Sequence, residues 1–426
     1  MNYDEAIEYI HSVNWTFCKP GLSRISALCE ALGHPEDSLK FIHVAGTNGK
    51  GSFCSMTASI LREAGYRVGL FTSPYIVRFN ERMRIDGEDI SDSELAEITE
   101  KIKPICDSMQ DKPTEFELIT AIAFVYFSSH KCDFVVLECG LGGRLDSTNI
   151  IKTPILSVIT GIALDHTAIL GDTPEKIAYE KAGIIKPRVP VMFGGEGESV
   201  TEVIRKKAEE EDATLYLASD LETSNISLDL NGATFDALGI TELHINLLGR
   251  YQLRNARNAL CAVKLLRKEG VNISDEAVRR GLAGTVWRAR FEVLSREPLV
   301  IYDGAHNREG VDALYESVME YFGDKPLICL SGTLADKEYT HTAEIISKIA
   351  TRAYTITPDN PRALSAEDFA KCIESLGTEA YATTSIAEAV ALAYADAKMS
   401  DMPLICFGSL YTYGEVAKEI EKQKEA

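Results

Sequence analysis

The sequence predicts an α/β protein made of two successive open sheets, the first of which carries a small antiparallel β insertion. Three observations predict it. From about residue 41 onward, short apolar runs alternate with amphipathic, helix-length segments, which is typical of parallel sheets covered by helices. Residues 213–247 alternate differently, with polar turns between short apolar runs. The strand-and-helix alternation then begins again at Leu299.

The first domain is expected over residues 1–290. The segment 118–129 is too long and too rich in alanine for a strand, so it is predicted to be a buried helix. Ser274 is expected to cap the helix that follows it, because a serine hydroxyl can accept from free N–H groups of a first turn. The predicted strands are 41–44, 67–71, 134–137, 155–159 and 189–193, and the predicted helices are 53–63, 118–129, 253–268 and 274–282.

The second domain is expected over residues 291–426. The boundary is placed in the segment 287–296, which is rich in arginine and lacks helical periodicity. About 130 residues suffice for a complete open sheet covered by helices. Its predicted strands are 299–302, 327–330, 353–356 and 404–407.

Composition excludes several classes of partner. The chain of 426 residues has 44 Lys and Arg against 64 Asp and Glu, and 44 − 64 gives a net charge of −20. Such a field repels phosphate backbones and anionic lipid, so no nucleic acid and no membrane partner is expected. The N-terminus has neither a basic nor an apolar leader region, which favours the cytoplasm. The ten cysteines are then expected to be buried, reduced thiols.

A glycine-rich segment directly follows the first strand and precedes a helix. This is the setting of a phosphate loop, in which free backbone N–H groups at a helix start and a lysine bind phosphate oxygens. The match to the usual pattern is incomplete, since Gly51 separates Lys50 from Ser52. The alternative is a ligand-free turn. The segment consists of Gly46, Thr47, Asn48, Gly49, Lys50, Gly51 and Ser52.

Two further strands of the same sheet end in candidate metal ligands. Glu138 ends the run 134–137, where a carboxylate next to a phosphate loop can hold Mg²⁺. His166 follows the strand 155–159 and is a candidate metal or phosphate contact. The alternatives are an ordinary acid at a strand end and a surface histidine. Glu180 and Lys181 lie close behind, and the alternative to a functional role for them is a solvated helix end.

Two other groups of residues invite a functional interpretation. The loop after the second strand contains Arg78, Glu81, Arg82 and Arg84, which suits an anionic second substrate. Its alternative is a solvated charged loop. In the second domain the segment 303–307 again joins a strand to a helix, and it places Asp303 and His306 where a ligand could lie. These two could equally be an N-cap and a surface histidine.

Together these motifs resemble those of the folylpolyglutamate synthase and dihydrofolate synthase family, a branch of the ATP-dependent Mur-type amide ligases. They occur in the family's order. The resemblance implies a P-loop Mur-ligase-like ATPase domain with the β insertion, followed by a smaller Rossmann-like α/β domain. It rests on the segments 46–52, 72–74, 81–82, 138–146, 164–166, 180–184 and 303–307.

The resemblance also implies roles for individual residues. Lys50, His166 and Lys181 would be catalytic, with Lys181 carbamylated. Two Mg²⁺ ions would be held by Ser52, Ser73, Glu138, His166 and Lys181. ATP would be bound by residues 46–52, Asn255, Arg290, Asp303 and His306. The folate substrate would contact Thr114, Arg144, Asp146, Tyr75 and Arg82. At Tyr75 the family usually has histidine, and 287–290 departs from the usual Trp-Pro-Gly-Arg.

The activity that the resemblance implies is ATP-dependent addition of L-glutamate to the carboxylate of a folate through an acyl phosphate. Dihydropteroate is a further candidate substrate, and a monomer is expected. A cell-wall Mur-type amino-acid ligase is an alternative with the same fold. A second alternative, from another class, is a P-loop regulatory switch that hydrolyses nucleotide without glutamate.

Overall fold

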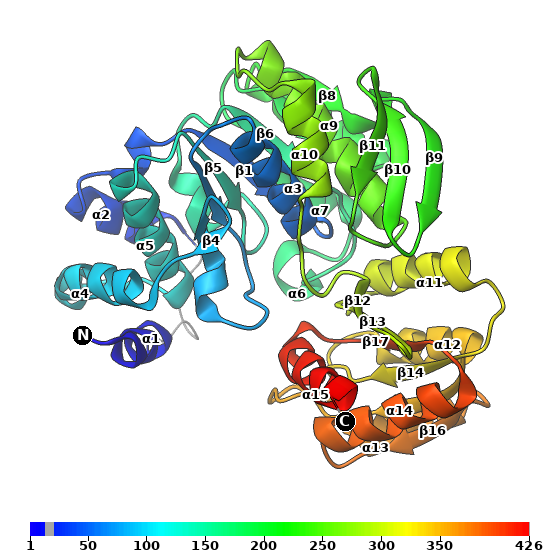
Figure 1. The fold of residues 1–426 in the computed structure, drawn as a ribbon. Coiled ribbons are helices and arrows are strands. Elements are labelled where there is room, and N and C mark those ends of the chain that lie inside the picture. The colour runs from blue at the N-terminus through cyan, green and yellow to red at the C-terminus, as the bar shows by residue number, and fades with distance from the viewer. Residues whose placement is uncertain (13–20, 426) are drawn as a thin grey trace. The chain divides into compact units, whose positions relative to one another are not determined.

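The computed structural model describes residues 1–12 and 21–425. The chain forms two compact units (Figure 1). The first comprises residues 1–227, 234–245 and 254–285, and the second comprises residues 228–233, 246–253 and those from 286 onward.

An eight-stranded sheet forms the centre of the first unit. Its strand order is β4-β3-β2-β5-β1-β6-β7-β8. The six strands from β2 to β8 in this order run parallel, whereas β3 and β4 are antiparallel additions at one edge. The strands are β1 (Phe41–Ala45), β2 (Val68–Phe71), β3 (Met83–Ile85), β4 (Glu88–Asp89), β5 (Phe134–Glu138), β6 (Leu156–Ile159), β7 (Val191–Phe193) and β8 (Leu215–Leu217).

The register of the three central strands positions the site. In β1, Val44 pairs with Glu138 of β5, and Ala45 pairs with Ile159 of β6. The carboxyl ends of these strands therefore meet at one edge of the sheet, where ligands of open α/β sheets usually bind. Every residue of the three strands is buried, which explains why they are mainly apolar and do not alternate with polar residues.

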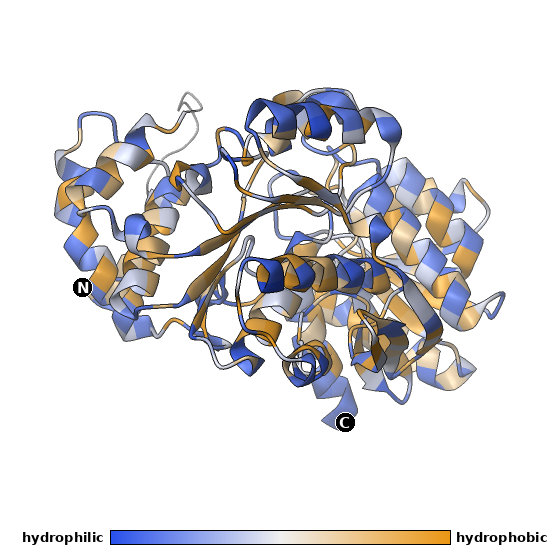
Figure 2. Ribbon diagram, turned by 90° about the horizontal axis from the view of Figure 1, so that it is seen from above, coloured by the Kyte–Doolittle hydropathy of each residue, from blue (hydrophilic) through white to orange (hydrophobic). Residues whose placement is uncertain are grey.

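Helices cover this sheet and bury its apolar side chains. One core cluster joins α1, α2, α4 and α5 to the sheet, and another joins α7 and α8 to β6 and β7. Figure 2 shows the strands as mainly hydrophobic and the helices as mixed. The helices are α1 (Tyr3–Ser12), α2 (Ser23–Ala31), α3 (Lys50–Glu63), α4 (Asp92–Ser108), α5 (Glu115–Ser129), α6 (Thr167–Leu170), α7 (Pro174–Ala182), α8 (Glu198–Glu210), α9 (Tyr251–Lys268) and α10 (Asp275–Ala283).

The predicted β insertion is present but begins later than expected. Strands β9 (Thr223–Asp229), β10 (Gly232–Ala237) and β11 (Ile240–Ile245) form a separate three-stranded sheet joined by tight turns (Figure 1). Residues 215–217 are not part of it, because they pair in parallel with β7 as the last strand of the large sheet. The prediction was wrong there because a three-residue strand is too short to show its direction.

The second unit is built on a six-stranded sheet of order β12-β13-β17-β14-β15-β16. All pairs but β12–β13 are parallel. Helices α11, α12 and α13 share one core cluster, while α14 packs against α15. The elements are β12 (Glu292–Arg296), β13 (Leu299–Asp303), α11 (Arg308–Phe322), β14 (Leu327–Ser331), α12 (Tyr339–Ile349), β15 (Ala350–Thr355), α13 (Ala366–Glu374), β16 (Glu379–Ala382), α14 (Ile386–Ser400), β17 (Leu404–Phe407) and α15 (Tyr413–Glu425).

The predicted fold class is confirmed. Ser274 caps α10 as expected, since its side chain accepts from the backbone N–H of Ala277. Sequence reasoning did not identify α1, α2, α4 or the short strands β3, β4, β12 and β16. The cysteines of the described residues are free thiols and are buried, apart from a partly exposed Cys372. No helix within 1–12 and 21–425 combines the length and apolarity that a membrane crossing requires.

Candidate active site

The phosphate loop joins β1 to α3 and is closed by its own side chains. The Lys50 ammonium donates to the carbonyl oxygens of Gly46 at 3.1 Å and Thr47 at 3.2 Å. The Thr47 hydroxyl donates to the carbonyl of Ala163 at 3.1 Å and accepts from the Ala163 N–H at 3.0 Å. These bonds attach the loop to the segment after β6. The lysine is thereby held over the loop, at the start of a helix, as phosphate binding requires.

Two glycines of the loop cannot carry a side chain. Gly46 has φ +153°, and a Cβ there would lie 2.0 Å from the Thr160 hydroxyl oxygen, which itself donates to the Asn48 carbonyl at 2.8 Å. Gly49 has φ +81°, and a Cβ there would lie 2.4 Å from the amide oxygen of Asn255. The predicted nucleotide residue Asn255 is thus placed directly against the loop.

We expect Gly46→Ala to destabilise the protein by about 1–3 kcal/mol, because the new methyl group meets Thr160 and the backbone is strained. The loop shift should also lower ATP-dependent turnover. Thermal unfolding and steady-state kinetics would measure both effects. Gly161→Ala is the matched control, since a Cβ there has no atom within 4 Å. Equal behaviour of the two variants would contradict the assigned role of Gly46.

Glu138 is a buried carboxylate beside the loop. One of its oxygens lies 3.8 Å from the Lys50 nitrogen, and the other accepts from the backbone N–H of Ser73 at 3.1 Å. Ser52 is buried in the first turn of α3. Glu138, Ser52 and Ser73 offer a carboxylate and two hydroxyl groups, and hard oxygen donors of this kind fit Mg²⁺.

Lys181 reaches the phosphate loop from α7. Its side chain is 4% exposed, and its ammonium donates to the Gly46 carbonyl at 2.7 Å, the same oxygen that Lys50 contacts. Burial lowers the pKa of Lys181 to about 7, and the neighbouring Lys50 charge acts in the same direction. Lys181 therefore loses its proton more readily than an ordinary surface lysine.

His166, in contrast to Lys181, has an exposed side chain. It precedes α6 with φ +49°, its backbone N–H donates to Asp165 at 2.8 Å, and its side chain is 52% exposed. The structure places it in the loop after β6, on the edge of the sheet where the sequence put it. Its role as a metal ligand stays a prediction.

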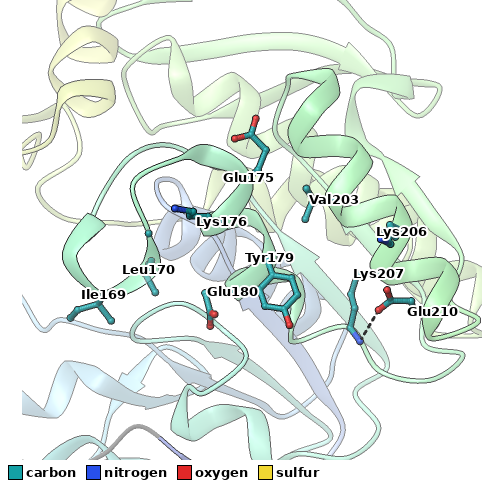
Figure 3. A pocket seen from close by; sticks show the side chains of 11 residues that line it. Ile169, Leu170, Glu175, Lys176, Tyr179, Glu180, Val203, Lys206, Lys207 and Glu210 are labelled. Atoms are coloured by element: carbon teal, nitrogen blue, oxygen red, sulfur yellow. Dashed lines mark ion pairs between the residues drawn. The ribbon is translucent and has the colours of Figure 1, made fainter.

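The Arg144 side chain is held by α7. Its guanidinium forms two bonds to Glu180, at 2.8 and 3.2 Å, and lies 5.7 Å from the centre of the Tyr179 ring. The alternative that Glu180 and Lys181 form a solvated helix end is therefore wrong, because Glu180 fixes Arg144 and Lys181 is buried. Tyr179 and Glu180 also line a pocket of about 560 Å³ between α7 and α8 (Figure 3). That pocket lies on α7, the helix from which Lys181 reaches the loop.

Asp146 turns inward. It accepts from the Leu141 N–H at 2.8 Å, the Thr148 N–H at 3.0 Å and the Thr148 hydroxyl at 2.6 Å. Burial raises its pKa. The Thr148 oxygen is also 2.8 Å from a ring nitrogen of His43, a buried residue of β1. Asp146 thus orders the turn that carries Arg144, and any contact of its own with substrate stays a prediction.

The other predicted folate residues lie in two capped segments. Thr114 caps α5, and its N–H donates to Glu117, which also pairs with Arg24 at 2.9 Å. The Arg82 guanidinium lies 5.1 Å from the centre of the Tyr75 ring, which is 37% exposed. Between them, the Glu81 carboxylate accepts from three successive N–H groups, those of residues 76–78. The basic loop is therefore organised around a buried carboxylate.

In the second unit the Asp303 carboxylate is fully engaged within the protein. It accepts from the Tyr251 hydroxyl at 2.5 Å, the Phe291 N–H at 2.9 Å and the Ala305 N–H at 2.8 Å. Burial raises its pKa, and the nearby Arg290 charge opposes that shift. His306 lies 2.8 Å from the Gly304 carbonyl through its Nδ1. The contacts of Asp303, Arg290 and His306 with ATP stay predictions.

Sequence reasoning missed several residues that shape the site. Thr160, His43 and Tyr251 all act through hydrogen bonds to distant segments. The signals that could have found them are a polar residue at the end of a buried strand, as for Thr160, and a polar residue inside one, as for His43.

Comparisons with known proteins agree with this geometry. The Mur ligase middle domain matches residues 44–263, and the Mur ligase glutamate ligase domain matches residues 289–410. The dihydrofolate synthase/folylpolyglutamate synthase of Bacillus subtilis is 40% identical over 86% of this chain and 87% of its own length. The folylpolyglutamate synthase of Lacticaseibacillus casei is 37% identical over 99% of both chains.

A solved structure is similar throughout. The Mycobacterium tuberculosis folylpolyglutamate synthase complexed with ADP and AMPPCP has a TM-score of 0.89 and 28% identity, covering 98% of this chain and 99% of that one. The two domain matches, the sequence similarity over most of the chain and the shared fold therefore agree with the phosphate loop described above. The chain belongs to the folylpolyglutamate synthase/dihydrofolate synthase family of Mur-type amide ligases.

Proposed function

We propose that this protein is an ATP-dependent ligase that adds L-glutamate to the carboxylate of a folate through an acyl phosphate. The observation that carries the proposal is the phosphate loop, where Lys50 and Lys181 both contact the Gly46 carbonyl and Glu138 lies alongside. Near full-length similarity to folylpolyglutamate synthases supports the reaction. We also propose dihydropteroate as a second substrate, since the Bacillus subtilis relative is named for both activities.

The loop supplies the nucleotide end of this reaction. Its backbone N–H groups lie at the start of α3, where the helix dipole favours the negative charge of phosphate. The Lys50 ammonium now rests on two carbonyl oxygens, and in our proposal it exchanges them for oxygens of the β- and γ-phosphates. Asn255, packed against Gly49, would contact the nucleotide beside the loop.

Two Mg²⁺ ions are part of the proposal. Glu138, Ser52 and Ser73 would hold them with oxygen donors, and His166 would add a nitrogen donor. When bound, the ions supply positive charge that offsets the charge of the transferring phosphoryl group.

We further propose that Lys181 is carbamylated. Its amine lies buried, 2.7 Å from a phosphate-loop carbonyl, so as an ammonium it would add charge next to Lys50. A neutral amine reacts with CO₂ by forming an N–C bond and losing one proton. The product is a carbamate whose oxygens are of the type that Mg²⁺ prefers.

The chemical steps follow from charge. A carboxylate is a poor acylating agent, so the folate carboxylate first takes the γ-phosphoryl group of ATP, giving an acyl phosphate and ADP. The neutral amine of glutamate then attacks the acyl carbon, phosphate leaves, and the amine loses a proton. In the first step Lys50 would stabilise charge that builds up on the phosphoryl oxygens, which is the main source of catalysis in such transfers.

The folate end is proposed to use the segments ordered by buried acids. Arg144 is presented by the turn that Asp146 organises and by its pair with Glu180. Thr114 caps α5, and Tyr75 with Arg82 belongs to the loop ordered by Glu81. Arg144 and Arg82 offer positive charge to an anionic substrate in a chain whose net charge is −20.

We propose that the enzyme works as a monomer in the cytoplasm and that the functional domains are 1–290 and 291–426. A cell-wall ligase with this fold is not favoured, because the similar proteins above are named as folate enzymes. A P-loop switch would hydrolyse nucleotide without glutamate.

Phosphate release separates these functions. With ATP, Mg²⁺ and glutamate present, we expect release to depend on added tetrahydrofolate, and to occur with dihydropteroate as well. The product, a folate longer by one glutamate, would be detected by mass spectrometry. It should not form when glutamate is omitted. Phosphate release that needs neither folate nor glutamate would contradict the proposal and favour the switch. Activity with tetrahydrofolate but not with dihydropteroate would contradict only the proposal that dihydropteroate is a second substrate.

A further inference from the structure

We propose that Tyr251, to which neither motif nor comparison assigns a role, is a positioning residue for nucleotide binding. It acts by fixing the Asp303 carboxylate and thereby the linker that carries Arg290. The inference rests on the proposed function, because Arg290 is a proposed contact of ATP.

Asp303 joins three segments of the second unit. Its Oδ2 accepts from the Tyr251 hydroxyl at 2.5 Å and from the Phe291 N–H at 2.9 Å, and its Oδ1 accepts from the Ala305 N–H at 2.8 Å. The side chain is 3% exposed. A buried carboxylate needs such donors, since an unsatisfied charge would be costly. Asp303 therefore ties these three segments to one another.

Two of the segments that Asp303 joins lie where the chain changes units. Tyr251 lies in 246–253, just before the chain enters the first unit within α9. Phe291 follows the point where it returns, at residue 286. Four residues beyond Tyr251, the same helix carries Asn255, which lies against Gly49 of the phosphate loop. One carboxylate thus tethers both the beginning of α9 and the linker.

Arg290 is held by the same arrangement. Its neighbours Ala289 and Phe291 have φ of +55° and +48°, a left-handed conformation that non-glycine residues adopt only when their surroundings impose it. The Ala289 carbonyl accepts from the Gly304 N–H at 2.9 Å, while the Phe291 N–H is bound by Asp303. A Cβ on Gly304 would lie 2.3 Å from the Arg290 guanidinium.

The rest of Tyr251 is positioned independently of its hydroxyl. Its ring packs on Gly249, where a Cβ would lie 2.8 Å from a ring carbon. The Gly249 N–H donates to the Tyr321 hydroxyl at 3.2 Å, and the Tyr321 ring stacks on Phe291 at 5.3 Å. Removing only the hydroxyl should therefore leave the packing in place while freeing Asp303 on one side.

The test compares Tyr251→Phe with Tyr302→Phe in the full-length enzyme. Tyr302 precedes Asp303 in β13, so its side chain points to the opposite face of the sheet. Its hydroxyl is also engaged, with the Ser409 carbonyl at 2.6 Å and Thr412 at 2.7 Å. Both variants lose one hydrogen-bonded hydroxyl in the same unit, but only Tyr251→Phe touches Asp303.

We expect Tyr251→Phe to raise KM for ATP and Kd for AMPPCP by about tenfold, with KM for glutamate changed less than about twofold. Tyr302→Phe should leave all three constants unchanged. A merely structural tyrosine would lower the melting temperature and the active fraction but leave these constants as in wild type. Wild-type values of KM for ATP and Kd for AMPPCP in Tyr251→Phe would overturn the proposal. Equal values of these constants in Tyr251→Phe and Tyr302→Phe would also overturn it.

Asp303→Asn provides a second, stronger variant. The asparagine amide would place an N–H donor against the hydroxyl and N–H donors that now bind the carboxylate. KM for ATP and Kd for AMPPCP should therefore rise further than in Tyr251→Phe. Unchanged AMPPCP affinity in folded Asp303→Asn would also overturn the proposal. If the wild-type enzyme shows no folate-dependent turnover, the proposed function fails, whereas the AMPPCP comparison still decides the role of Tyr251.

Discussion

Replacing Lys50 with methionine is expected to lower kcat by about a thousandfold while the protein stays folded. Methionine keeps most of the unbranched stem but removes the ammonium that rests on the Gly46 and Thr47 carbonyls. The phosphoryl oxygens carry developing charge in the transition state, and without Lys50 that charge loses a stabilising cation. Phosphate release and glutamate incorporation, measured with saturating ATP, would both report the loss.

Lys40→Met is the matched control, because Lys40 is an exposed lysine just before the amino end of β1, and the phosphate loop follows the carboxyl end of that strand. Its activity should equal that of wild type. Loss of the Lys50 contacts should change the melting temperature little, since the loop keeps its bonds from Thr47 and Thr160. A Lys50→Met enzyme with normal kcat would rule out the phosphate-loop assignment.

Lys181→Ala is expected to lower activity on the order of a hundredfold, because a proposed metal ligand is lost. Lys181→Arg should be no better, since guanidinium keeps the positive charge and does not form the carbamate. Short carboxylic acids such as acetate should partly restore the alanine variant by supplying the missing anionic oxygens. Folate-dependent phosphate release with and without acetate would measure both effects.

The control for this experiment is Lys186→Ala. Lys186 is a partly buried lysine whose pKa is also lowered by burial, but its ammonium donates to the Asn149 carbonyl at 3.0 Å rather than to the phosphate loop. It should keep nearly full activity. A fully active Lys181→Ala enzyme would contradict the role of Lys181, and an inactive enzyme without acetate rescue would contradict the carbamate.

The pH dependence of Lys181 has a definite sign. Only the neutral amine reacts with CO₂, and burial lowers the pKa of Lys181 to about 7. Carbamylation, and the activity that depends on it, should therefore decrease as the pH falls below about 7. Rates in bicarbonate buffer and in CO₂-depleted buffer across this range would test it. The CO₂ dependence should vanish in Lys181→Ala.

The sequence by itself determined the fold class and the nucleotide end of the candidate site. Strand-and-helix alternation is a local pattern, so it placed β1, β5, β6 and four strands of the second sheet within a few residues of their observed bounds. The phosphate loop is equally local, because glycines, lysine and serine occur within seven consecutive positions. The position of Lys50 at the start of α3 therefore follows from the sequence alone.

Only the tertiary structure decided which groups face one another. It brought Lys181 to Gly46, 135 positions away, paired Arg144 with Glu180, and enclosed Asp303 between Tyr251 and Phe291. It also placed β8 in the large sheet rather than in the insertion. The physical reason is the range of the interactions. Periodicity and turn composition report on neighbours along the chain, whereas a buried hydrogen bond or ion pair depends on packing between segments distant in sequence.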